Sequence, residues 1–123
     1  MALHAGLTPE RWALFSLDQQ ILMIANEMNR AAKLTAPEDA DRLRRSYECA
    51  LELADLTIAA HAERGLRREL RLWRDLVAAL HGAPAADPAA HAAALRSLLC
   101  FTPEAARQIP LLTALGNPTP DTR

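Results

Sequence analysis

A repeating apolar spacing constrains this chain most strongly. Leu17, Ile21, Ile24, Met28 and Ala31 follow one another at intervals of four, three, four and three residues. This spacing places all five side chains on one face of an α-helix. A second run has the same spacing and contains Leu66, Leu70, Trp73, Val77 and Leu80. Each run predicts a helix that buries one face against another part of the chain.

Ala and Leu supply most of the apolar residues, and both favour helices. We therefore expect an all-α fold, an up-down-up-down four-helix bundle with a short C-terminal helical extension. The helices are expected at 16–33, 37–62, 66–81 and 88–100 within a single domain over residues 1–123, with a disordered tail at 117–123. Short connections between the first three helices predict antiparallel neighbours.

Capping residues predict where these helices begin and end. Ser16 with Gln19 fits a capping box, and Thr35 with Glu38 fits a second one. Thr8-Pro9, Asp87-Pro88 and Thr102-Pro103 predict further helix starts, with Trp12 and Phe15 folded back as a hydrophobic plug. Gly65 is expected to break the chain before the third helix, and Gly82 to form a left-handed cap at its end.

Charge and composition exclude several classes of protein. The formal net charge is −1, which gives no overall positive field for nucleic acid. No apolar run approaches the length of a membrane span, and the N-terminus does not resemble a signal peptide. The four His residues are too scattered for a metal site, and the two Cys are far apart. We therefore expect a cytoplasmic protein with reduced thiols, no metal and no cofactor.

Arg74 and His81 are the candidates for catalysis. They lie seven residues apart, so two helical turns place them on the same side of a helix. HEPN-type ribonucleases use an Arg and a His without a metal, with His for acid–base chemistry and Arg for the phosphate. In a simpler interpretation, Arg74 pairs with Asp55 and His81 is a favourable cation at a helix end. Folding the second and third helices together about residue 64 places Arg74 level with Asp55.

Three sequence elements resemble a family of small uncharacterised prokaryotic proteins. The first matches S-L-x-x-Q-x-x-x-I-x-x-E-x-x-R-A between Ser16 and Ala31, and the second matches A-L-E-L-x-D-L-T-I between Ala50 and Ile58. The third has Glu69-Leu70 followed by Arg74-Asp75, where the family has Arg-Glu. The resemblance covers about residues 12 to 80 and implies no activity. Family members usually have aromatic residues at the positions of Leu80 and His81, so the similarity to HEPN domains is limited to the fold.

The recurring polar residues define a candidate binding set: Gln20, Glu27, Arg30, Glu52, Asp55 and Arg74. They could form a salt-bridge network between the first three helices, or line a ligand site within the bundle. Arg30 is expected near Asp41, and Glu27 near Arg44 and Arg45.

A second apolar stripe on the helix at 37–62 indicates a surface covered by another helix or subunit. We expect Leu53, Leu56 and Leu72 to form this interface. The function we expect is therefore a non-enzymatic interaction or oligomerisation subunit whose partner is a second copy or another protein. The alternative is a HEPN-like component of a toxin–antitoxin or defence module, as a ribonuclease acting on RNA or as its inactive partner.

Overall fold

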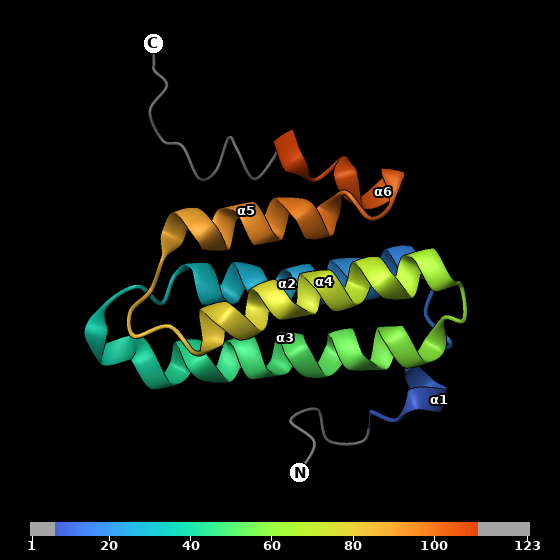
Figure 1. Cartoon of the computed structure of the whole chain (residues 1–123). Helices are drawn as coiled ribbons and strands as arrows, with labels where there is room; N and C mark the ends of the chain where they lie inside the picture. The colour runs from blue at the N-terminus through green and yellow to red at the C-terminus, as the bar shows by residue number, and fades with distance from the viewer. Residues whose placement is uncertain (1–6, 111–123) are drawn as a thin grey trace.

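The computed structural model describes residues 7–110, and every regular element in this range is helical. Figure 1 shows four long helices lying side by side and two short ones at their periphery. The long helices are α2 (Leu17–Ala32), α3 (Ala40–Ala60), α4 (Arg64–His81) and α5 (Pro88–Leu99). The short ones are α1 (Pro9–Trp12) and α6 (Pro103–Ala106), and a 3₁₀ turn, η1 (Pro37–Asp39), precedes α3. The tail predicted at 117–123 lies outside the described residues.

Each long helix packs against two others. Helix α2 contacts α3 and α5, and α4 contacts the same two helices from the other side. The core between them contains the apolar face predicted for α2 and the buried centre of the α4 face: Ile21, Ile24, Met28, Ala31, Leu70, Trp73 and Val77. Tyr47 and Ala50 from α3 and Leu95 and Leu98 from α5 complete it. The periodicity therefore identified the faces of α2 and α4 that pack inward.

Four predicted helix starts are confirmed by side-chain caps. Ser16 accepts a hydrogen bond from the Gln19 backbone N–H at 3.2 Å, and the Gln19 side chain accepts from the Ser16 N–H at 2.9 Å. Asp87 caps α5 through the Ala90 N–H, and Thr8 and Thr102 cap the two short helices. These residues satisfy backbone donors that have no partner within the helix.

The predicted start of the second helix is wrong by three residues. Thr35 forms no cap, and the 3₁₀ turn at Pro37–Asp39 precedes α3, which begins at Ala40. The turn starts after Ala36 and has no side-chain hydrogen bond at its cap. A pattern of Thr and Glu three residues apart was therefore not sufficient for a capping box here.

Gly65 does not break the chain. Glu63 is the N-cap of α4, and its carboxylate accepts the Leu66 backbone N–H at 2.6 Å. The helix therefore starts at Arg64, and Gly65 lies in its first turn. Gly82 ends α4 with φ −87°, so the predicted left-handed cap is also wrong.

Helix α1 is fixed to α3 by a tryptophan, as the predicted plug requires. Trp12 is fully buried, and its indole N–H donates to the Thr57 hydroxyl at 2.9 Å. Phe15 lies against the edge of Trp12 but remains partly exposed. No helix within residues 7–110 is long and apolar enough to cross a membrane.

Candidate functional site

Arg74 and His81 bind carboxylates on the neighbouring helix. Arg74 donates from Nε and Nη2 to the two carboxylate oxygens of Asp55, at 2.5 and 3.1 Å. Two turns further along α4, His81 Nε2 lies 2.9 Å from a carboxylate oxygen of Glu48. Both pairs join α3 to α4, and the two acids are seven residues apart like their partners. The predicted proximity of Arg74 and Asp55 is confirmed.

This pairing changes the chemistry that the two residues offer. The hydrogen bond and charge of Asp55 raise the pKa of Arg74, so the guanidinium is held as a cation by its own carboxylate. The two-pronged contact uses Nε and Nη2 of Arg74, so this edge of the guanidinium is not available to grip a phosphate in the same forked way. The Glu48 carboxylate engages Nε2 of His81 through a single contact. A phosphate approaching these residues would also meet two carboxylates on the same surface.

Gln20 lies apart from the other predicted binding residues. Its side chain is buried, and its amide nitrogen donates to the backbone carbonyls of Trp12 and Phe15 at 2.9 and 3.2 Å. Its amide oxygen lies 2.7 Å from Nε2 of His61, which therefore donates. Gln20 thus holds the α1 segment and the end of α3 together.

Glu27, Arg30 and Glu52 gather around Cys49. Glu27 accepts from Arg30 at 2.8 Å on α2. Burial and the nearby Glu27 and Glu52 carboxylates raise the pKa of the Cys49 thiol. Asp41, which was expected near Arg30, instead pairs with Arg44 on its own helix at 3.2 Å. The six predicted binding residues therefore lie in three places: at Gln20, around Cys49, and at the Asp55–Arg74 pair.

The predicted interface residues differ in exposure. Leu53 is only 2% exposed and belongs to the chain's own core, so its assignment to an external surface is corrected. Leu56 is half-buried against the core, whereas Leu72 is 53% exposed. Leu76, which the sequence analysis did not select, is 51% exposed one turn further along α4. The sequence could have identified Leu76, because it lies four residues from Leu72 and outside the buried face of the helix.

A buried pair that the sequence analysis missed lies between α3 and α5. The Tyr47 hydroxyl is 2.7 Å from Nδ1 of His91, and His91 Nε2 is 2.8 Å from the Met28 carbonyl oxygen. A carbonyl can only accept, so the proton is on Nε2, and Nδ1 accepts the Tyr47 hydroxyl proton. Burial lowers the pKa of His91 and raises that of Tyr47 to about 12. Both groups are therefore neutral near pH 7.

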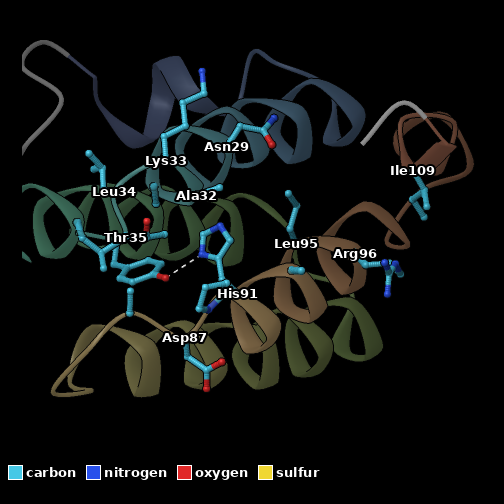
Figure 2. A pocket seen from close by; sticks show the side chains of 16 residues that line it. Asn29, Ala32, Lys33, Leu34, Thr35, Asp87, His91, Leu95, Arg96 and Ile109 are labelled. Carbon is cyan, nitrogen blue, oxygen red and sulfur yellow. Dashed lines mark hydrogen bonds between the residues drawn. The ribbon is translucent and has the colours of Figure 1, made fainter. Parts of the chain in front are cut away.

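These two residues line a pocket of about 650 Å³ between the C-terminal end of α2, α3 and α5. Figure 2 shows His91 at its wall, with a dashed line marking the bond to the tyrosine hydroxyl. A smaller pocket of about 190 Å³ shares Leu34, Leu43 and Tyr47 with it. One sequence signal could have identified His91: it shares a helical face with Ala94, Leu95 and Leu98, which predicts a histidine on the apolar side of α5.

Within the part of the chain that the structure describes, no three His, Cys, Asp or Glu residues are grouped so that they could hold a metal ion. Comparison with protein-family models, with curated proteins and with solved structures gives no match. The exposed leucines of α4 and the Tyr47–His91 pocket are therefore the two features that indicate a function.

Proposed function

We propose that the protein is a non-enzymatic interaction subunit that associates through α4 with a second copy of itself. The observation behind the proposal is the exposure of Leu72 and Leu76, two large apolar side chains one turn apart on the same helix. Exposed apolar groups that cluster on a surface favour burial by a partner, whereas single ones do not. The proposed framework is an up-down-up-down four-helix bundle, which fits the contacts of each long helix with two others.

We extend the proposed surface onto α5, because α5 packs against α4. Trp73 donates its indole N–H to the Ala94 carbonyl at 2.8 Å, which fixes α5 beside α4. Ala93, directly before Ala94, and Ala90, one helical turn earlier, are both exposed on α5. Small side chains permit close approach of a second helix, and leucines provide apolar area. We define the α4–α5 surface as Leu72, Leu76, Ala90 and Ala93.

A second copy is the partner that the charges favour. The exposed Arg71 and Asp75 border the leucines on α4, so both signs of charge flank the apolar residues. A two-fold interface places the same patch opposite itself, and a border of mixed sign permits this without a single-sign clash. The chain's net charge of −1 also gives little repulsion between copies.

Light scattering over a micromolar concentration series tests the association. We expect the wild-type mass to rise toward that of a dimer, and Leu72→Glu with Leu76→Glu to return it to the 13.5 kDa monomer. Leu14→Glu is the matched control, because Leu14 is 85% exposed but lies between α1 and α2. A monomeric wild type at high micromolar concentration, or equal loss of association in Leu14→Glu, would contradict the proposal.

The alternative proposal is a HEPN-like, metal-independent ribonuclease. It is supported by the position of Arg74 and His81 on one side of α4, both partly exposed. The carboxylate pairing of both residues makes it the weaker proposal. Incubating the full chain with RNA in EDTA, beside Arg74→Ala and His81→Ala, decides between them. Cleavage that is lost in both variants would establish the nuclease, and no cleavage by the wild type would exclude it.

A further inference from the structure

The larger pocket has the volume and lining of a small-molecule site. Its volume of about 650 Å³ lies within the range of about 300–1,000 Å³ that is usual for such sites. Aliphatic side chains form most of its wall, among them Leu34, Leu43, Leu95 and Ile109. These residues come from the segment after α2, from α3, from α5 and from the segment after α6, so the pocket depends on the packed fold. Such a wall favours an aliphatic ligand.

Tyr47 and His91, the two buried polar residues of the pocket, are already bonded to protein groups. The Tyr47 hydroxyl donates to His91, and His91 donates to Met28, so neither residue has a proton to offer a ligand. The Tyr47 oxygen can still accept a hydrogen bond. This inner wall therefore provides no counter-charge for an ionised group, and an ionised group must be bound elsewhere.

Two cations line the same pocket. Lys33 and Arg96 form no ion pair with another residue in the described range 7–110. The one acid in the lining, Asp87, is at the N-terminus of α5, where its carboxylate accepts the Ala90 N–H at 3.1 Å. Arg96 lies nine residues later, which is about 13 Å along a helix axis. Figure 2 shows Arg96 beside Leu95, toward Ile109 and away from Asp87.

We propose that this pocket binds a small aliphatic monocarboxylate, with its chain along the Leu34, Leu43 and Leu95 wall and its carboxylate at Arg96. The Arg96 guanidinium, which has no ion-pair partner among residues 7–110, offers the forked donors that match a carboxylate, far from Asp87. The apolar wall excludes water from the chain of the ligand. This site is distinct from the α4–α5 surface, because the two have no residue in common.

Calorimetric titration of the full chain with octanoate tests the site. We expect saturable 1:1 binding of octanoate and much weaker binding of octylammonium, which has the same chain length and the opposite charge. Arg96→Gln is expected to weaken octanoate binding by about three- to tenfold, because it removes one ionic contact at the surface. Arg45→Gln is the matched control, since Arg45 is exposed and lines neither pocket.

A second variant tests the location without changing charge. Ala92 lines the pocket and is exposed, so Ala92→Trp fills the space without replacing a core residue. We expect it to abolish octanoate binding while the circular dichroism spectrum and melting temperature stay near those of the wild type. The proposal is overturned if wild-type octanoate binding is not saturable, if Arg45→Gln weakens it as much as Arg96→Gln, or if a folded Ala92→Trp binds normally.

Discussion

The Trp12 indole N–H donates to the Thr57 hydroxyl, and the same hydroxyl donates to the Leu53 carbonyl oxygen, each at 2.9 Å. Both Trp12 and Thr57 are fully buried. A single hydroxyl therefore satisfies a donor from α1 while remaining bonded within α3. No water can replace it as a partner without opening the core.

Thr57→Val is expected to destabilise the protein by about 1–3 kcal/mol, because the buried indole N–H loses its acceptor. Thr57→Ser retains the hydroxyl and loses only a methyl group, which is worth about 0.8 kcal/mol. Urea unfolding monitored by circular dichroism measures both free energies. A Val variant no less stable than the Ser variant would show that the hydrogen bond contributes nothing measurable.

Asp55→Ala is expected to cost less than about 1 kcal/mol. The Arg74 and Asp55 side chains are 36% and 54% exposed, so water screens their attraction and can solvate the arginine left behind. Trp73→Ala is the reference from the adjacent core position, expected to cost about 3–5 kcal/mol. Chemical unfolding of both variants provides the comparison. A loss above about 3 kcal/mol in Asp55→Ala would indicate a buried ion pair instead.

Gly65→Ala is expected to stabilise the protein by about 0.5–1 kcal/mol. Gly65 is helical in the first turn of α4, and an added Cβ would meet the Glu63 carboxylate at an ordinary contact distance of 3.4 Å. Alanine lowers the conformational entropy of the unfolded chain and favours the helix. The melting temperature of the variant measures the effect, and a fall in it would show that the added Cβ disturbs the Glu63 cap.

The His91 imidazole is expected to make stability fall in acid. Its pKa in the folded chain lies below the ordinary 6.5 because burial opposes the charged form, although the hydrogen bond to Met28 partly offsets this. The unfolded state therefore binds the proton first as the pH drops through about 6.5, and the free energy of unfolding decreases toward the lower folded pKa. Well above pH 6.5 the His91 side chain is neutral in both the folded and the unfolded state, so its contribution to the free energy of unfolding does not change with pH.

Urea unfolding of wild type and His91→Gln between about pH 7.5 and pH 5 measures this dependence. His91→Gln is expected to have a flatter acid slope than the wild type, whatever its stability at neutral pH. His81→Gln is the matched control, because it removes a partly exposed imidazole paired with Glu48. An unchanged acid slope in His91→Gln would assign the pH dependence to other groups.

The sequence predicted those features that depend on neighbouring residues or on a short connection. The Ser16 and Asp87 caps act within three residues, so local pattern was sufficient to identify them. The Arg74–Asp55 contact followed from antiparallel folding about a short turn between α3 and α4. Gly65 was wrongly expected to break the chain. The Glu63 carboxylate caps the helix, so α4 begins at Arg64, before the glycine.

The Tyr47–His91 bond could not be predicted in the same way. The two residues are 44 positions apart, and all of α4 lies between them, so no short turn sets their register. Leu53 was assigned to an interface because a helix with two apolar sides leaves open which side the chain itself covers. Helix α1, through Trp12, covers part of α3 and accounts for some of that second side.

The two tryptophans are bonded in two different parts of the molecule. The Trp12 indole proton points to α3, and the Trp73 indole proton points to the backbone of α5. Their two side-chain signals in a ¹H–¹⁵N NMR spectrum therefore report separately on these contacts. Solvent exchange that increases at the Trp12 signal alone would reveal release of the N-terminal segment, and exchange that increases at the Trp73 signal alone would reveal separation of α4 from α5.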